Sequence, residues 1–129
     1  MDKKEFTYRG KTLAELKTLD VREFAKYLPS RERRSVLRNF QHIEKFVSDA
    51  KEKSSRGKKI KTHFRDLVIV PELIGMKIQV HAGNAFNLFE ITDEMLGHRL
   101  GEFALTRRRV NHGSAGIGAT KGSKHKAKK

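Results

Sequence analysis

The chain has 129 residues and a net charge of +14, with 29 lysines and arginines against 15 acidic residues. It contains no run of about 18 apolar residues and no cysteine, which argues against a membrane span, disulfides, thiolate metal sites and a cysteine nucleophile. The polar N-terminus has no apolar signal core, so we expect an intracellular protein. Because so large a positive charge requires a polyanionic partner, we expect nucleic acid to be that partner.

The N-terminal part of the chain predicts two short helices. Thr12 and Glu15 have the spacing of a capping box, in which each side chain binds the backbone N–H of the other residue. Asp20 and Glu23 repeat this spacing a few residues later. Pro29 ends the second pattern, because the residue before a proline is disfavoured in helical geometry.

A longer amphipathic helix is predicted from about Arg31 to Lys53, with Ser30 as its cap. Its apolar positions recur every three or four residues and form one stripe: Val36, Leu37, Phe40, Ile43, Val47 and Ala50. Its first turns hold four arginines opposed only by Glu32: Arg31, Arg33, Arg34 and Arg38. Each cation near a helix N-terminus opposes the macrodipole by roughly 0.3–1 kcal/mol. We therefore interpret the four arginines as facing phosphate rather than as a solvated face.

Beyond this helix the pattern changes from helical to extended. Residues 51–62 are rich in lysine, serine and glycine and predict a basic linker. Residues 67–70 form a short apolar run rich in β-branched residues and closed by Pro71. In residues 76–82, apolar and polar side chains alternate, which predicts a half-buried strand.

The second half of the extended region predicts a hairpin and a short helix. Gly83 and Asn84 mark a tight connection, and residues 86–91 resume an extended pattern. A short helix is expected to begin at Thr92 and to end at Gly97; Gly97 and Gly101 are expected to allow close turns through positive φ. Helices followed by strands predict an α+β fold with a small, mostly antiparallel sheet and an extended basic C-terminal tail.

The charge is distributed unevenly along the chain. Residues 103–129 carry eight basic and no acidic residues, whereas the first 102 residues have a net charge of +6. This division is typical of a folded body with a basic tail that becomes ordered against a counter-charge. A tail that serves only solubility is the alternative, but the glycines in residues 113–118 favour close backbone approach to a ligand.

The sequence shows no pattern of a catalytic or metal site. No two of the six histidines have the i, i+4 spacing of a helical zinc site, so we expect no metal. His98 is flanked by Glu94 and Glu102, which we interpret as capping and charge balance rather than acid–base chemistry. Residues 113–120 have the glycine spacing of a phosphate-binding loop, but Ala119 stands where its lysine is required. We therefore predict neither a cofactor nor an enzymatic activity.

Several motifs closely resemble the small-subunit ribosomal protein nineteen family. The most specific is Gly97-His98-Arg99-Leu100-Gly101-Glu102-Phe103, followed by Thr106-Arg107. The resemblance also includes residues 70–76, 81–84, 92–96, 110–113 and 116–120. The opening Thr7-Tyr8-Arg9-Gly10 and the cluster at residues 31–34 resemble the archaeal and eukaryotic branch of that family.

The resemblance implies a structural protein of the small-subunit head in the cytoplasmic ribosome, bound to small-subunit ribosomal RNA. It implies ribosomal protein thirteen as a neighbour and a tail that reaches toward the transfer-RNA sites. Three parts are expected: a helical extension and basic linker (1–62), an α+β RNA-binding core (63–106) and a flexible basic tail (107–129). The body residues expected to face RNA, beside the four helix arginines, are Arg65, Lys77, His81, Asn84, His98, Arg99 and Arg107. Those of the tail are Arg108, Arg109, His112, Lys121 and Lys124.

Two other classes remain open on the residues alone. A chromatin-like DNA-binding protein would share the charge but would prefer duplex DNA. A small RNA-modifying enzyme would need convergent acid–base or cofactor residues, which the sequence does not show. Because most aromatic residues fall at apolar-stripe or strand positions, the expected mode of RNA binding is backbone and shape recognition with little base readout.

Overall fold

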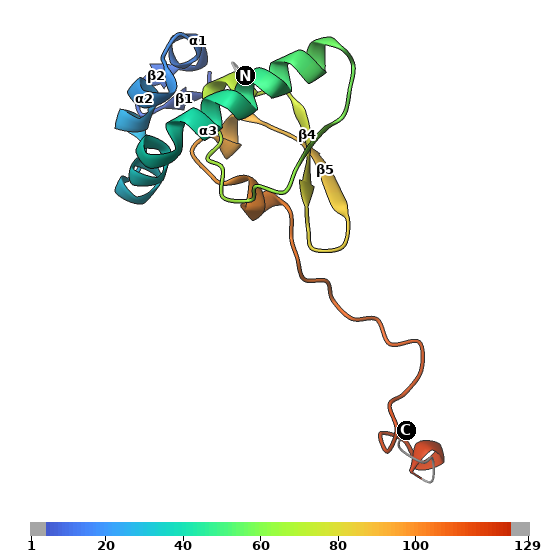
Figure 1. Ribbon diagram of the computed structural model, residues 1–129. Coiled ribbons are helices and arrows are strands. Elements are labelled where there is room, and N and C mark those ends of the chain that lie inside the picture. Colours follow the sequence, from blue (N-terminus) through green and yellow to red (C-terminus); the bar gives the residue numbers. More distant parts are fainter. Residues whose placement is uncertain (1–4, 125–129) are drawn as a thin grey trace.

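The computed structural model describes residues 5–124 and has an α+β fold, as predicted (Figure 1). Its helices are α1 (Leu13–Lys17), α2 (Val21–Phe24) and α3 (Ser30–Ser55). Its strands are β1 (Thr7–Tyr8), β2 (Lys11–Thr12), β3 (Ile60–Thr62), β4 (Lys77–His81) and β5 (Phe86–Glu90). Short 3-10 turns occupy Ala25–Tyr27, Pro71–Leu73, Asp93–Met95, Leu100–Phe103 and Lys121–Ser123.

Both predicted helix starts near the N-terminus are confirmed. At α1 the backbone N–H of Glu15 donates to Thr12 Oγ1 (3.4 Å), and the N–H of Thr12 donates to a Glu15 carboxylate oxygen (3.0 Å). At α2 the N–H of Asp20 donates to a Glu23 carboxylate oxygen (3.4 Å). The antiparallel pairing of β1 with β2 was not predicted, because two-residue strands are too short to show a period.

Helix α3 is longer than predicted and kinked. Pro29 rather than Ser30 takes the N-cap position, and the helix continues to Ser55. At Asn39 the backbone leaves helical geometry (φ −117°, ψ 21°), which divides the element into two segments. The predicted apolar stripe is wrong at Leu37, which is 47% exposed. Successive helix residues point about 100° apart, so the narrow seam that buries Val36 leaves Leu37 outside.

The three-stranded sheet is mixed, with the order β3-β4-β5. Strand β4 pairs antiparallel with β5, which confirms the predicted hairpin, and β3 pairs parallel with β4. The prediction of a linker over residues 51–62 is therefore wrong at both ends, and only 56–59 connect α3 to β3. Ile60 and Thr62 are buried in the sheet. A three-residue strand after a lysine-rich run gives too few alternations to be recognised.

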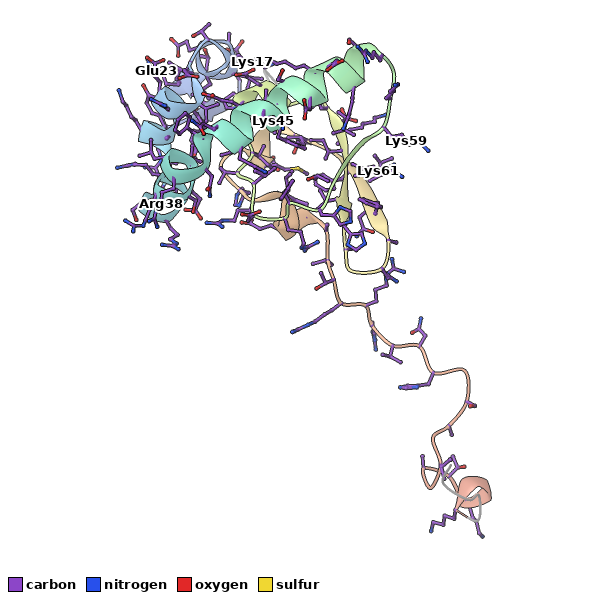
Figure 2. The ribbon with its side chains drawn as sticks, viewed as in Figure 1. Lys17, Glu23, Arg38, Lys45, Lys59 and Lys61 are labelled. Atoms are coloured by element: carbon purple, nitrogen blue, oxygen red, sulfur yellow. The ribbon has the colours of Figure 1, made fainter. Side chains whose placement is uncertain are left out.

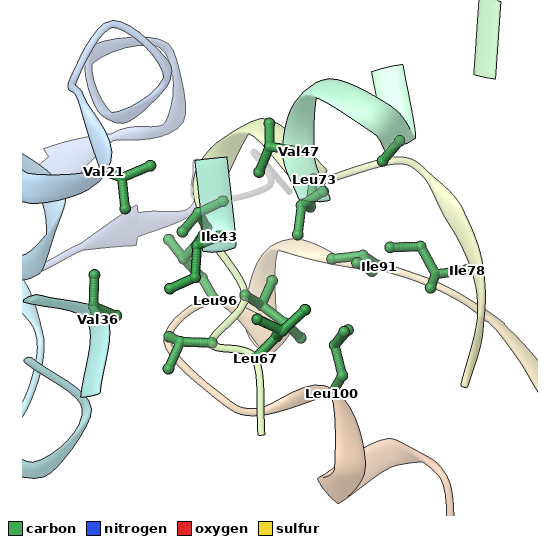
Figure 3. Close-up of a cluster of buried hydrophobic side chains, with 14 of the residues drawn as sticks. Val21, Val36, Ile43, Val47, Leu67, Leu73, Ile78, Ile91, Leu96 and Leu100 are labelled. Carbon is green, nitrogen blue, oxygen red and sulfur yellow. The ribbon is translucent and has the colours of Figure 1, made fainter. Parts of the chain in front are cut away.

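The apolar run at residues 67–70 is buried but does not join the sheet. It pairs locally with the segment that follows Gly97: the N–H of Ile69 donates to the His98 carbonyl (2.8 Å), and the N–H of Leu100 donates to the Leu67 carbonyl (3.0 Å). Figure 3 shows side chains from α3, this run and residues 96–100 meeting in one core. Residues on both sides of position 62 thus share a single hydrophobic cluster.

Gly97 has a positive φ of 80°, as expected, whereas Gly101 does not. Gly101 is required for space instead, since a Cβ there would lie 2.9 Å from the Arg65 carbonyl oxygen. At Gly97 a Cβ would lie 2.7 Å from Tyr8 Oη and 3.2 Å from a methyl of Leu28. Close packing therefore holds the turn at residues 97–103 (the family motif) against the N-terminal elements at Gly97 and against Arg65 at Gly101.

We expect Gly97→Ala to lower the free energy of unfolding by about 2–4 kcal/mol, from backbone strain and crowding together. Gly75→Ala is the matched control. Gly75 has a similar φ of 85° but open space around its Cβ position, so strain alone should cost about 1–2 kcal/mol. Urea denaturation of both variants measures the difference. Equal losses at the two positions would contradict the role of crowding at Gly97.

Candidate nucleic-acid interface

Three of the four predicted arginines at the start of α3 form an exposed basic surface. Arg31, Arg34 and Arg38 are exposed, and Figure 2 shows Arg38 pointing away from the body. Their spacing places them along one side of the helix. Arg33 is exposed but partly engaged: its guanidinium donates to the carbonyls of Lys26 (3.3 Å) and Leu28 (3.0 Å). Arg33 therefore also fixes the turn that precedes α3.

A shallow surface hollow of about 500 Å³ lies among these side chains. Its lining residues are Ser30, Arg33, Arg34, Leu37 and Arg38. The exposed Leu37 thus has cationic neighbours, and the lining of the hollow combines one apolar side chain with guanidinium groups. Such a surface suits the sugar–phosphate backbone, which presents both apolar sugar faces and anionic oxygens.

Arg65 lies between three backbone carbonyls. Its guanidinium donates to His81 (2.7 Å), Gly101 (2.9 Å) and Ala104 (2.5 Å). These contacts join the end of β4 to the turn within residues 97–103 and to Ala104, which follows it. The fork of an arginine matches several acceptors at once, which a lysine ammonium does less well. The side chain is half-buried, so its principal contacts in the free protein are structural.

Arg99 connects the family motif to α3. Its guanidinium donates to Ser35 Oγ (3.0 Å) and lies 4.0 Å from a Glu32 carboxylate oxygen. Glu32, which opposes the helix arginines in the sequence, is thus paired across the fold. Arg99 also lines a hollow of about 250 Å³ whose other walls include His42, which makes an edge-on ring contact of 4.4 Å with Phe64.

His98 points outward beside the same turn. Its Nδ1 lies 2.7 Å from a Glu102 carboxylate oxygen, and both side chains are about half exposed. Its ring meets Phe103 edge-on at 5.9 Å. Glu102 also accepts from the backbone N–H of Arg99 (3.3 Å), as a capping residue does. This agrees with the interpretation of Glu102 as a cap and counter-charge.

Of the remaining predicted body residues, Lys77, His81 and Asn84 lie along β4 and its hairpin, whereas Arg107 lies on the exposed tail segment and not in the body. Lys77 is exposed at the start of β4, and Asn84 is exposed at the hairpin tip. His81, at the end of β4, is half-buried, and its Nδ1 accepts from the Gly83 N–H (3.2 Å). Lys77 and Asn84 therefore stand at opposite ends of one hairpin.

The sequence did not single out His63 and Phe86 as site residues. The structure packs both against His81, with ring centroids 4.6 Å (His63–His81), 5.0 Å (His81–Phe86) and 5.2 Å (His63–Phe86) apart. Lys61 Nζ lies 5.1 Å from the Phe86 ring centroid. The register of the sheet brings these residues together from positions that are distant in the sequence.

The tail carries its basic residues on an extended, exposed segment. It runs away from the body from residue 105 onward (Figure 1). The predicted residues Arg107, Arg108, Arg109, His112, Lys121 and Lys124 are all exposed along it. The residues beyond 124 lie outside the described part of the chain. A segment with this charge and exposure presents cations to an anionic polymer.

Within residues 5–124 no three histidine or acidic side chains are grouped to hold a metal ion. No helix of the described chain has the length and apolar character needed to cross a membrane. The candidate site therefore consists of exposed cationic surfaces on a body that is held together by its own internal hydrogen bonds.

Comparison with known proteins gives a consistent family. The family model described as "Ribosomal protein S19" matches residues 30–112. Small ribosomal subunit protein uS19 of Methanocella arvoryzae is 51% identical over 124 residues, covering 95% of this chain and 86% of that protein. Proteins of the same name from Methanospirillum hungatei and Methanococcoides burtonii are 49% and 47% identical, each over 95% of this chain and 88% of the relative.

These matches confirm the family that the motifs resemble, including its archaeal side. A family of structural ribosomal proteins also agrees with the prediction that the chain is not an enzyme. The arginine-rich start of α3, the sheet and the motif at residues 97–103 all fall within the matched region. The chain belongs to the ribosomal protein S19 family.

Proposed function

We propose that this protein is a structural component of the head of the small ribosomal subunit and binds small-subunit ribosomal RNA through the phosphate backbone. Its relatives are named small ribosomal subunit proteins. In such a role the body stabilises a folded RNA junction by placing cations between strands that would otherwise repel each other. No chemical step is required of the protein.

One observation carries this proposal: the basic charge is exposed on two segments that contain little or no acid. The tail from residue 103 onward holds eight basic residues and no acidic one. At the start of α3, Arg31, Arg34 and Arg38 are exposed, while the nearby Glu32 faces Arg99. Both segments therefore offer cations to a ligand without an internal carboxylate to neutralise them.

The family also suggests more specific partners. We infer that the neighbouring protein in the head is ribosomal protein thirteen, and that the tail reaches toward the transfer-RNA sites of the cytoplasmic ribosome. In this arrangement, residues 1–62 and 63–106 together form the docked body, and residues 107–129 form the tail. The shared core of the first two parts supports their acting as one unit.

A competition experiment distinguishes this function from that of a chromatin-like DNA-binding protein. We expect the full chain to prefer a folded fragment of small-subunit ribosomal RNA over duplex DNA of equal length by at least about tenfold. RNA offers A-form geometry and 2′-hydroxyls that DNA lacks, and these supply the preference. Fluorescence anisotropy with each polymer as competitor measures it. Equal or stronger competition by DNA would favour the chromatin-like alternative.

A further inference from the structure

We propose that the solvent-facing side of the three-stranded sheet is a platform on which an unpaired RNA base stacks. We name it the open sheet face, and its residues are Lys61, His63, Gln79, His81, Phe86 and Leu88. The proposal rests on the proposed RNA-binding function and adds base contact to a surface expected to contact only the backbone.

Strand register explains why these side chains share one face. Lys61 is paired with Gln79, and Gln79 with Leu88, so the three form one row across the sheet. His81 is paired directly with Phe86 in the next outward row. Side chains alternate between the two sides of a strand, and the intervening residues Ile60, Ile78 and Val80 are buried. The core therefore occupies one side of the sheet and solvent the other.

The rings of the open sheet face are oriented by contacts with one another and remain partly exposed. His63 is exposed, while His81 and Phe86 are half-buried. Each ring touches the other two within 5.2 Å between centroids, and the Gly83 N–H bond to Nδ1 orients the His81 ring. Phe86 does not pack against the core, unlike the nearby Phe89. An oriented ring cluster outside the core is what a stacking platform requires, because a base needs one accessible aromatic face.

Charge around the rings favours RNA as the occupant over a second protein. Lys61 lies close to the Phe86 ring. Lys58 and Lys59, which precede Lys61 in the chain, are exposed. Figure 2 shows Lys59 and Lys61 on the same side of the molecule as the hairpin. The acidic residue on this side of β5, Glu90, lies opposite Lys77 in the strand register, at the end of the hairpin away from the rings. A stacked base would thus have ammonium groups near its own phosphate.

Replacing Phe86 with leucine tests the platform, because it keeps an apolar side chain but removes the ring. The probes are a short single-stranded adenosine RNA and a fully paired RNA duplex of equal length, titrated with the full chain at several salt concentrations. Stacking is worth about 1–3 kcal/mol per base, so we expect Phe86→Leu to weaken single-strand binding at least fivefold. The slope of affinity against salt should be unchanged, and duplex binding should change less than twofold.

Three further variants serve as controls. Phe86→Tyr keeps a ring and should bind as the wild type does. Leu105→Ala removes an exposed apolar side chain outside the sheet and should have no effect. Lys61→Gln should lower the salt slope for the single strand by about 0.7, because one phosphate contact is lost. If Phe86→Leu does not fold, the exposed His63→Ala replaces it, with at least a twofold loss expected.

The outcomes separate this proposal from the general function. Unchanged single-strand affinity in the ring variants, with steep salt dependence in the wild type, would overturn the platform and leave RNA binding intact. Equal losses on single strand and duplex would also overturn it, since a duplex has no free base to stack. A wild-type chain that binds neither RNA would instead contradict the proposed function itself.

Discussion

Between 50 and 200 mM monovalent salt, the affinity of the full chain for a small-subunit ribosomal RNA fragment is expected to fall by roughly 10³–10⁵. This is the loss for about 6–10 neutralised phosphates on the duplex scale, because each contact releases condensed counterions. The exposed arginines of α3 and the basic tail provide enough cations for that number. Filter binding or anisotropy across a salt series gives the slope.

Deletion of residues 111–129 is the matched comparison for this measurement. It removes five lysines, all in the acid-free part of the chain, so the log–log slope should become smaller by up to about 3.5–4.5. The shortened protein should remain folded and still bind RNA, because the buried core lies within residues 16–104. In assembled particles the deletion should impair transfer-RNA placement more than assembly.

An affinity that hardly changes with salt would contradict phosphate recognition. Unfolding on truncation would contradict the division between body and tail.

Arg65→Ala is expected to lower the free energy of unfolding by about 2–5 kcal/mol. The substitution leaves the carbonyls of His81, Gly101 and Ala104 without their donor. Each unsatisfied buried acceptor costs about 1–3 kcal/mol, and because these three contacts are only partly buried, water recovers part of that cost. Arg65→Lys should lose less, because the ammonium keeps its charge but cannot reach all three acceptors.

Urea denaturation of these variants separates a structural role for Arg65 from a role in RNA binding. Arg34→Ala is the control, since this exposed arginine of α3 should change stability by less than about 0.5 kcal/mol while weakening RNA binding. If Arg65→Ala had wild-type stability but reduced RNA affinity, the carbonyl contacts would be incidental and direct RNA contact would be the role of Arg65.

Local patterns in the sequence predicted much of the fold. The capping pairs Thr12–Glu15 and Asp20–Glu23, and the alternation over residues 76–82, depend on neighbours within a few positions. Strand β3 depends on pairing with β4, which is distant in the sequence. The two-residue strands β1 and β2 are close in the chain but too short to show a period, and the seam buried on α3 was narrower than the predicted stripe at Leu37. The α+β class was therefore predictable, whereas the mixed sheet order was not.

The residues of the candidate site were likewise predictable only in part. Charge and exposure agree for Arg34, Arg38 and the tail, because nothing nearby in the chain neutralises them. The internal bonds of Arg65 were not predictable, since its acceptors are 16, 36 and 39 residues away. The ring cluster was missed for the same reason: Lys61 and Phe86 come together only through the register of two strands.

The extended segment after Ala104 has a kinetic consequence for assembly. Twenty residues, from 105 to 124, can span up to about 65–70 Å when stretched. In the proposed complex with RNA, this tether would confine the terminal lysines to a limited volume once the body has docked, with an effective concentration near RNA in the millimolar range. The second attachment is then intramolecular, so a weak tail contact can close rapidly and release without detaching the protein.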